Sequence, residues 1–333
     1  MGGDLRGGPG TPPARRTGSV TTPLVSIVLP TRNGAATLPA VFEAIMRQRV
    51  EFPFEIVAVD SGSSDGTADW LHGRADRLIS IGADAFDHGL TRNLGIENAR
   101  GELIVLLVQD ALPASGRWLA ELTRPLLEDG SIAGAYARQA PRPDASAVTR
   151  YYLERYAATS ETPRTSAVPS PEGFMALSPI ERVLACTFDN VCSCIRRSVW
   201  RAIPFPETPI AEDVEWARAV LLAGHRLQYV PAATVIHSHE RSARYELYRT
   251  YLVHRRLRAL FGLATIPTVG HLVRAIASTL RVHTRCLAGP SGPRSRPAEV
   301  LRTLSLAVAL PLGQYLGARA ADTGRDLLRP TGV

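Results

Sequence analysis

Apolar runs alternate with helical spacings along the first third of the chain. Residues 25–29 (VSIVL) and 55–59 (EIVAV) are short, mainly apolar runs that end at polar or helix-breaking residues, which is typical of buried parallel strands. Between them, the apolar side chains of residues 36–47 recur at helical spacing, at Leu38, Val41, Phe42, Ile45 and Met46. The chain is therefore predicted to open with strand, helix and strand.

The same alternation continues to residue 108. It predicts helices at about 65–72 and 89–99, and strands at 78–81 and 103–108, so the fold class is α/β with a doubly wound sheet. Ligands of such sheets bind at the carboxyl ends of the strands. The polar residues that fall at these ends are Thr31, Arg32, Asn33, residues 60–64, Gln109 and Asp110.

The second half of the chain is less regular. Residues 139–176 are rich in Pro, Ser, Thr and Arg and have little periodicity, which predicts a long mobile loop over the ligand site. Regular structure is predicted again as a strand at 190–195, a helix from Arg197, a helix at 211–223 that ends at Gly224, and two closing strands at 227–230 and 234–236.

The charge is unevenly distributed. All 38 basic residues are Arg, and residues 241–333 hold 15 of them against four acidic residues, whereas the remaining 23 face 27 acidic residues. A basic tail on an acidic body predicts contact with an anionic surface, either phospholipid or nucleic acid.

The tail also has an apolar side. Residues 271–287 predict an amphipathic helix with Leu272, Val273, Ile276, Leu280 and Leu287 in one arc and Arg274, Arg281 and Arg285 opposite it,. Residues 303–318 are more apolar but contain Pro311 and Gly313, so we expect a broken segment that lies in a membrane surface or dips into it. We favour a membrane over nucleic acid; the alternative is a helical pair that packs on the body or on another subunit.

Residues 1–22 and the cysteines exclude other classes of protein. The first 22 residues have no apolar central region, so we expect a disordered leader and not a signal peptide. No run of 18 apolar residues occurs, so no membrane span is predicted.

Cys186, Cys192, Cys194 and Cys286 have no spacing typical of a disulfide framework. We expect reduced, buried thiols; a metal site at Cys192 and Cys194 is the alternative.

Four segments in order resemble the family 2 glycosyltransferases, which have the GT-A fold: VSIVLPTRNGAATL, EIVAVDSGSSDGT, FDHGLTRNLGIENARGELIVLLVQDA and AEDVEWARAVLLAG. The resemblance covers about residues 25–239. It implies a cytoplasmic, metal-dependent, inverting enzyme that moves a sugar from a nucleotide diphosphate donor to an acceptor hydroxyl. It also implies a catalytic domain at 23–241, with a nucleotide-binding half at 23–138, an acceptor half at 139–241 and a helical basic region at 242–333.

The nucleotide site is implied at the ends of the first two strands. In the family, the first strand end and the Asp-Ser-Gly-Ser turn hold the nucleotide, which assigns Pro30, Thr31, Arg32, Asn33, Asp60, Ser61, Gly62 and Asp65 to it. A carboxylate there can accept hydrogen bonds from a base imide or a ribose hydroxyl. We expect Asp60 to contact the nucleotide and Asp65 to cap the turn; the alternative is that Asp60 also only caps it.

The metal site departs from the family pattern. The usual Asp-x-Asp is Val108-Gln109-Asp110 here, so the first carboxylate is missing. We group Gln109, the middle residue of the pattern, with the donor-binding residues. Asp110 can still bind Mg²⁺ or Mn²⁺, because these ions often take only one or two protein carboxylates. His237 and His239 lie on one face of a strand end and are further candidate ligands. We prefer His239; purely structural histidines are the alternative.

Two helix starts complete the site that the resemblance implies. His88, Arg92 and Asn93 of the FDHGLTRNLG segment are assigned to the donor, with Arg92 and the helix terminus facing the diphosphate; a solvated Arg is the alternative. Asp213 matches the family's general base, which takes the acceptor proton. Glu212 and Trp216 are assigned to the acceptor side, with a helix-dipole role as the alternative for Glu212.

The substrate follows from the resemblance alone. The Gln-Asp-Ala and Phe-x-His-Gly-x-Thr-Arg-Asn stretches are similar to rhamnosyltransferases that use dTDP-L-rhamnose. We therefore expect rhamnosyl transfer to a saccharide or lipid-linked acceptor in surface polysaccharide assembly, peripheral to the inner face of the cell membrane. UDP- or GDP-sugar transfer and a non-catalytic nucleotide-sugar-binding scaffold stay as alternatives, and a homo-oligomer is open.

Overall fold

The computed structural model describes residues 22–288 and 297–328. The leader predicted for residues 1–22 lies outside this range except for its last residue. Within the described residues, nine strands form one mixed sheet in the order β3–β2–β1–β4–β8–β6–β9–β5, with β7 paired to β9. The strands are β1 Val25–Thr31, β2 Phe54–Ser61, β3 Arg77–Ile81, β4 Leu103–Leu107, β5 Leu112–Pro113, β6 Ile132–Ala140, β7 Arg164–Ser166, β8 Cys192–Arg196 and β9 Arg226–Ile236.

Strand direction determines which ends meet at one edge of the sheet. β1 is parallel to β2 and β4, and β2 is parallel to β3. β8 is antiparallel to both β4 and β6, and β6 is parallel to β9. The carboxyl ends of β1, β2, β3, β4, β6 and β9 therefore share one edge. The first residues of the antiparallel strands β8 and β5 lie at that same edge.

Apolar side chains cover both faces of the sheet, as the continuous apolar runs predict. In β1, Ile27 and Leu29 pack into one apolar cluster while Val28 packs into the other. The first cluster includes residues of α1 (Leu38–Met46), α2 (Thr67–Leu71) and α4 (Trp118–Glu128). The second includes residues of α3 (His88–Glu97), α8 (Arg197–Ala202) and α9 (Glu212–Leu222). The α/β fold class is confirmed, and the sheet is mixed.

The segment 139–176 differs from the prediction of a loop. It contains the end of β6, α5 (Ala147–Leu153), a short 3-10 turn (Ala157–Thr159), β7 and α6 (Pro171–Ala176), and α7 (Pro179–Ala185) follows it. Ser146, Ser170 and Ser178 cap α5, α6 and α7 through their hydroxyl groups, so the serine content marks helix starts. The two closing strands predicted at 227–230 and 234–236 form one strand, β9, whose register with β6 shifts between Ala137 and Arg138.

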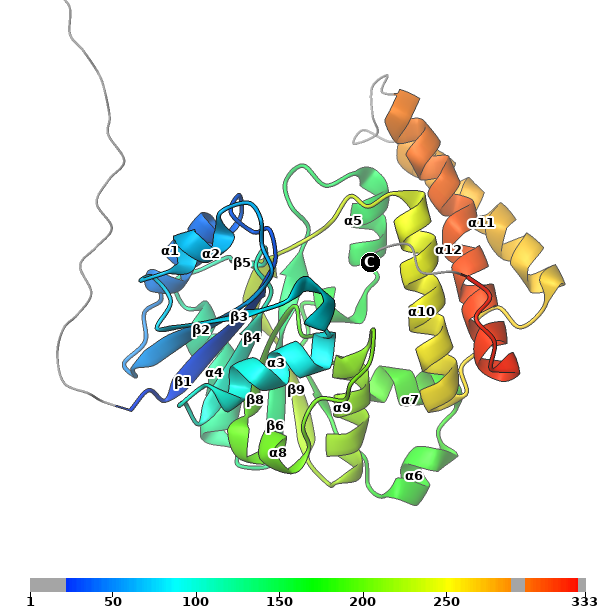
Figure 1. Ribbon diagram of the computed structural model, residues 1–333. Coiled ribbons are helices and arrows are strands. Elements are labelled where there is room, and N and C mark those ends of the chain that lie inside the picture. The colour runs from blue at the N-terminus through cyan, green and yellow to red at the C-terminus, as the bar shows by residue number, and fades with distance from the viewer. Residues whose placement is uncertain (1–21, 289–296, 329–333) are drawn as a thin grey trace, which may run out of the picture.

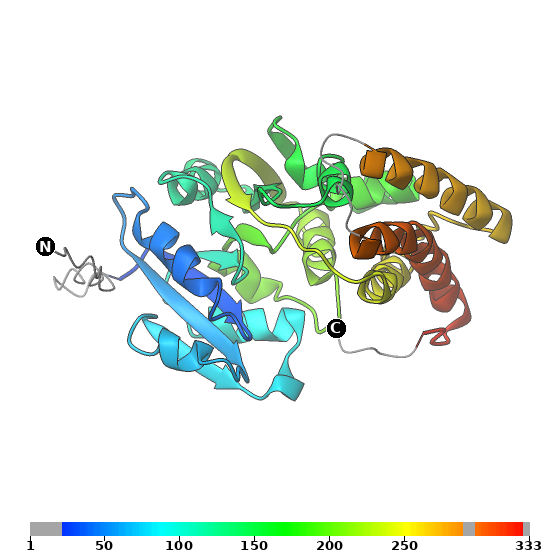
Figure 2. The ribbon, with the colours of Figure 1, turned by 90° about the horizontal axis from the view of Figure 1, so that it is seen from above.

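Three helices follow the sheet: α10 (Ala243–Phe261), α11 (Val269–Ala288) and α12 (Pro297–Thr323). Figures 1 and 2 show them on the side of the molecule away from α1 and α2. α12 passes through Pro311 without a break, so the prediction of a broken segment is wrong. A Cβ at Gly313 would lie 2.7 Å from Leu247 O, and one at Gly317 would lie 2.3 Å from Tyr251 O. Glycine therefore lets α12 pack closely against α10.

The helices are not independent of the sheet. Phe261 of α10 is buried in the second apolar cluster, together with Trp216 of α9 and Phe174 of α6. Among the described helices, α12 alone is long and apolar enough to cross a membrane. A helix buried inside a globular protein meets the same criteria, so length and composition do not make α12 a membrane span.

The cysteines are free thiols. Cys186, Cys192 and Cys194 are buried and Cys286 is half-buried, and burial raises the pKa of all four thiols. The expectation of reduced cysteines agrees with this structure. Cys192 accepts a hydrogen bond from Trp118 Nε1 at 3.3 Å, which is a packing contact.

Candidate active site

Strand register brings Asp110 and the two histidines together at the carboxyl edge. Leu112 of β5 pairs with Ile236 of β9, so Asp110, two residues before the pair, lies beside the residues that follow β9. The carboxylate of Asp110 is 3.7 Å from His237 Nε2 and 3.6 Å from His239 Nε2. Candidate ligand atoms of the three residues all lie within 4.8 Å of one another, and the two imidazole rings are 4.6 Å apart.

A chain of hydrogen bonds orients His237. Its Nδ1 is 2.9 Å from Gln139 Oε1, and Gln139 Nε2 donates to Asp189 Oδ2 at 2.5 Å. Tyr156 donates its hydroxyl proton to the same Asp189 oxygen at 3.0 Å. Because Gln139 Oε1 can only accept, Nδ1 of His237 carries the proton and Nε2 keeps its lone pair toward Asp110.

The donor set fits a divalent ion. Burial lowers the pKa of His237 to about 4 against the opposing charge of Asp110, and burial also lowers the pKa of His239. Both imidazoles are thus neutral near pH 7, the form that binds metals. One carboxylate and two imidazoles suit Mn²⁺ better than Mg²⁺, which prefers oxygen ligands. Arg142 approaches the same carboxylate, with Nη2 at 3.1 Å from the Asp110 carbonyl and 3.4 Å from Oδ2.

Asp213 lies at the start of α9, half-buried next to the first residues of β8. Its Oδ2 accepts from the backbone N–H of Asn190 at 3.3 Å, and its Oδ1 accepts from that of Val214 at 2.8 Å. Burial, and then the charges of Glu212 and Asp189, raise the pKa of Asp213 well above its ordinary value. Asp189 and Asn190 thus connect Asp213 to the chain that ends at His237. A carboxylate with a raised pKa is suited to take a proton.

Arg92 is neither solvated nor free. The residue is 5% exposed, with Nη1 at 3.1 Å from Glu212 Oε1 and at 2.8 Å from the His88 carbonyl. Burial alone would raise the pKa of Glu212, but Arg92, His88 and Asn190 together hold it below its ordinary value. Glu212 is buried, so its role here is to hold Arg92 and Asn190 and not to reach an acceptor.

The N-terminus of α3 is also capped by a side chain of the protein. Asp87 Oδ1 accepts from the backbone N–H groups of Gly89 and Leu90 at 2.8 and 2.9 Å, so a carboxylate already caps the terminus that was expected to face the diphosphate. Asn93 uses both ends of its amide on Trp200 and Phe205 and holds the segment before α9. These residues are structural neighbours of the site.

Trp216 is a core residue, and its assignment to the acceptor side is wrong. It is 1% exposed, its ring lies 5.1 Å from Phe188 and 5.4 Å from Phe205, and its Nε1 donates to Ile203 O at 2.8 Å. His88 lies one turn before Arg92, half-buried, with its ring 4.9 Å from Phe86. Burial lowers the pKa of His88 despite the nearby charge of Glu212.

The nucleotide-side residues lie together at the ends of β1 and β2, where Thr31 pairs with Asp60. Asp60 Oδ2 accepts from Ser63 N at 3.0 Å, and its Oδ1 accepts from Ser63 Oγ at 2.5 Å, so Asp60 caps the turn. Asp65 accepts from Ala35 N at 3.0 Å and from Thr67 N at 3.1 Å. Gly62 adopts a φ of +70°. Of the described side chains here, Ser61 Oγ is buried without a hydrogen-bond partner.

Gln109 connects this group to β4. Its Nε2 donates to Arg32 O and its Oε1 accepts from Arg32 N, both at 2.9 Å. Asn33, at a φ of 49°, accepts from Ser64 N at 2.9 Å. A Cβ at Gly34 would lie 2.4 Å from Gln109 Oε1, so glycine is needed there. Gln109, the middle residue of the family's Asp-x-Asp pattern, thus holds the backbone of Arg32 directly after β1, whose end contains Pro30.

Four residues of the site escaped the sequence analysis: Gln139, Arg142, Asp189 and Asn190. Gln139 is the next-to-last residue of β6, whose many small residues (IAGAYARQA) do not form the apolar pattern of a buried strand. Asp189 and Asn190 precede β8, and a strand start is at the ligand edge only if the strand runs antiparallel. The polar pair at the start of a predicted strand was the signal that the sequence offered, but the sequence did not show the direction of that strand.

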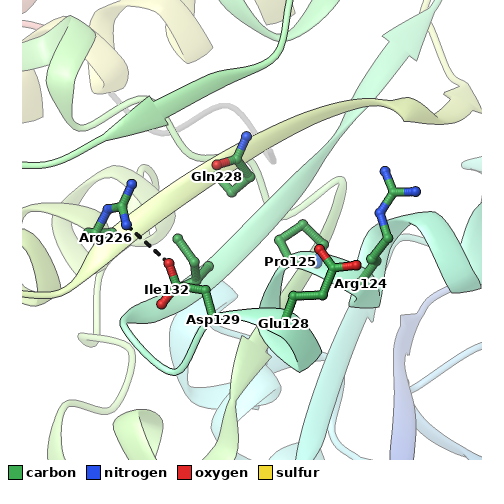
Figure 3. Close-up of a pocket in the computed structure, with 7 residues that line it drawn as sticks. All are labelled: Arg124, Pro125, Glu128, Asp129, Ile132, Arg226 and Gln228. Atoms are coloured by element: carbon green, nitrogen blue, oxygen red, sulfur yellow. Dashed lines mark hydrogen bonds and ion pairs between the residues drawn. The ribbon is translucent and has the colours of Figure 1, made fainter.

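The cavity in Figure 3 lies elsewhere. It is a shallow surface depression lined by Arg124, Pro125, Glu128, Asp129, Ile132, Arg226 and Gln228. Ile132 and Arg226 are the first residues of β6 and β9, so the cavity is at the amino ends of these strands, opposite the edge that holds Asp110. Arg226 and Asp129 pair across it at 3.0 Å.

Comparison with known proteins agrees with this geometry. The family model "Glycosyl transferase family 2" matches residues 26–179. The O-antigen chain rhamnosyltransferase RfbN of Salmonella typhimurium is 29% identical over 68% of this chain and 70% of its own length, and WbaN of Salmonella anatum is 29% identical over 69% and 70%.

Among solved structures, the mannosyltransferase PcManGT of Pyrobaculum calidifontis, in complex with GDP-Man and Mn²⁺, has a TM-score of 0.56 at 17% identity, over 92% of this chain and 89% of its own. That likeness concerns the fold alone. The matched segment begins in β1 and contains the strand ends that carry Thr31, Asp60 and Asp110. With this match and its four motifs in order, the chain is similar to the family 2 glycosyltransferases.

Proposed function

We propose that the protein catalyses inverting sugar transfer with Asp213 as the general base. The acceptor oxygen forms a bond to the anomeric carbon while the bond from that carbon to the diphosphate oxygen breaks. The acceptor proton passes to Asp213, and the electron pair of the broken bond leaves on the nucleoside diphosphate. The observation that supports this best is a half-buried carboxylate of raised pKa, linked through Asn190 and Asp189 to the Asp110 cluster.

Asp110, His237 and His239 would hold the divalent ion, with Mn²⁺ favoured by the two imidazoles. The ion would supply positive charge to the donor diphosphate. Gln139 keeps His237 in the tautomer that leaves Nε2 free. Gln109 and Gly34 hold the backbone beside Asp60, where the nucleotide would bind.

The donor is proposed from the relatives. Two proteins of 29% identity over about two thirds of the chain are named as O-antigen chain rhamnosyltransferases, which supports L-rhamnose from dTDP-L-rhamnose. The acceptor would be a saccharide or lipid-linked saccharide in surface polysaccharide assembly. This would take place at the cytoplasmic side of the cell membrane.

Nucleotide release from a panel of donors tests this proposal. With alkyl glycosides as acceptors, we expect dTDP-L-rhamnose to release nucleotide at least about tenfold faster than UDP- or GDP-sugars, because discrimination between sugars in a pocket is of this order. Faster turnover of a UDP- or GDP-sugar would overturn the rhamnose assignment. Binding of donors without any nucleotide release would favour a scaffold. Asp213→Asn is the control for release by contaminating enzymes.

We also propose that the C-terminal helices attach the enzyme peripherally to anionic membrane. The predicted arc on α11 is partly used inside the protein: Leu272, Ile276 and Leu280 are half-buried, on the side of the helix that carries buried His283. Val273 of the same arc is 62% exposed and stands beside exposed Arg274. Exposed apolar and basic side chains together favour an interfacial position.

Liposome flotation measures this attachment. We expect the full-length protein to float with vesicles that contain anionic lipid, and Val273→Asp to reduce the floating fraction severalfold, since a charge would enter the apolar layer. Ser278→Asp adds the same charge at an exposed position about 140° around α11 and should have a smaller effect. Salt should weaken binding only in part. Loss of all binding in moderate salt, with no effect of Val273→Asp, would indicate a purely electrostatic partner such as nucleic acid.

A further inference from the structure

The two cationic groups that were predicted to face the leaving diphosphate, Arg92 and the N-terminus of α3, already have partners within the protein. Arg92 is buried in its ion pair with Glu212, and the N-terminus of α3 is capped by Asp87. Arg142 is hydrogen-bonded to Asp110. A divalent ion would supply part of the charge, but transferases also use arginine to bind phosphate oxygens as a fork.

Helix geometry places Arg249 of α10 between the two halves of the site. Seven residues separate it from Arg256, so both lie on one face of the helix, and Arg256 Nε bonds Glu215 in the first turns of α9 at 3.0 Å. In the other direction, α10 starts at Ala243, four residues after His239. Arg249 therefore lies along the helix between the start of α9, which carries Asp213, and the metal cluster.

The opposite face of α10 packs on α12. Leu247, Thr250 and Tyr251 contact the glycines of α12 and lie at least about 100° around the helix from Arg249. Farther along the Arg249 face, Leu257 and Leu260 pack on the second apolar cluster. Arg249 is thus on the side of α10 that faces the catalytic body, at the end nearest the site.

Arg249 is exposed and, among the residues that the structure describes, forms no hydrogen bond or ion pair. Its neighbours on α10 do: Arg255 pairs with Asp326, Arg256 with Glu215 and Arg258 with Asp322. Arg249 nevertheless interacts electrostatically with ionisable groups of the site. Burial lowers the pKa of His88 and His239, and Arg249 lowers each further; burial raises the pKa of Asp189, and Arg249 opposes that rise.

We propose that the guanidinium of Arg249 binds the diphosphate of the donor and stabilises the negative charge that develops on the leaving nucleoside diphosphate. The proposal rests on the transferase function proposed above, but not on the identity of the sugar. It gives α10 a direct part in the site, so the helical region after residue 241 completes the catalytic machinery.

Arg249→Gln removes the charge, and Arg249→Lys keeps it without the fork. For Arg249→Gln we expect kcat to fall on the order of 100-fold, as when one transition-state donor is removed. The Kd of dTDP should rise roughly 10- to 100-fold, the loss of a charge-assisted hydrogen bond. Arg249→Lys should lie between it and wild type. Arg244→Gln is the matched control, because Arg244 is exposed on the same helix about 140° away,.

Calorimetry with dTDP, UDP, GDP and the nucleoside thymidine separates this proposal from the donor assignment. Weaker binding of nucleoside diphosphates with unchanged thymidine binding supports a diphosphate contact, whichever sugar is transferred. Wild-type affinity for all three diphosphates together with wild-type kcat in Arg249→Gln would overturn the proposal. A lower melting temperature in Arg249→Gln than in Arg244→Gln would also contradict it, because a residue without partners in the protein should not stabilise the fold.

Discussion

Replacing Asp213 with Asn is expected to lower kcat by about 10³- to 10⁴-fold, near the upper end of what a general base contributes, while the donor still binds with nearly wild-type affinity. The amide fills the same space and can accept from Asn190 N through its oxygen, but it cannot take the acceptor proton. Turnover and calorimetric donor binding are the two measurements. Glu207→Gln, an exposed change shortly before α9, should leave both unchanged.

The pH dependence of kcat/KM in the wild type is an independent test of Asp213 as the general base. Because the pKa of Asp213 is raised by burial and by Glu212 and Asp189, the carboxylate is deprotonated only above that raised value. kcat/KM should therefore rise with pH as Asp213 loses its proton, and the Asp213→Asn variant should lose this rise. Wild-type turnover in Asp213→Asn, or the same pH rise in the variant, would remove Asp213 from the base role.

Removing divalent ions with a chelator is expected to abolish transfer, and Mn²⁺ should restore it. Asp110→Asn and His239→Ala should both weaken Mn²⁺ and nucleoside diphosphate binding, because the ion would join protein to phosphate. Gln139→Leu should weaken Mn²⁺ binding by roughly 10- to 100-fold without removing a ligand. Without the hydrogen bond to Gln139, the imidazole of His237 is no longer held in the tautomer that leaves Nε2 free for the ion.

Mn²⁺ binding followed by electron paramagnetic resonance provides a readout apart from activity. His225→Ala is the control, since His225 precedes the same strand, β9, at its opposite end. Full activity in excess chelator would show that protein cations alone, Arg249 among them, stabilise the leaving group.

Several parts of the site could be predicted because they depend on short stretches of chain. Asp60 and Asp110 each follow an apolar run, and His237 and His239 alternate at a strand end, so local periodicity was enough to assign them to one edge. Arg92 shows the limit of this reasoning. A helical spacing does not distinguish a solvated arginine, a phosphate-binding arginine and a buried partner of Glu212, because the distinction depends on a residue 120 positions away.

By itself, the sequence determined the order of the first strands and helices and the polar residues at the strand ends, since these follow from the alternation of apolar and polar positions. The tertiary structure alone decided that β8 runs antiparallel between β4 and β6, which brings Asp189 and Asn190 to the edge that holds Asp110. It also decided that the small-residue strand β6 carries Gln139 to His237, and that α10 turns Arg249 toward the site. The physical reason is that strand direction and helix docking are set by the burial of apolar surface between distant segments, which no local pattern records.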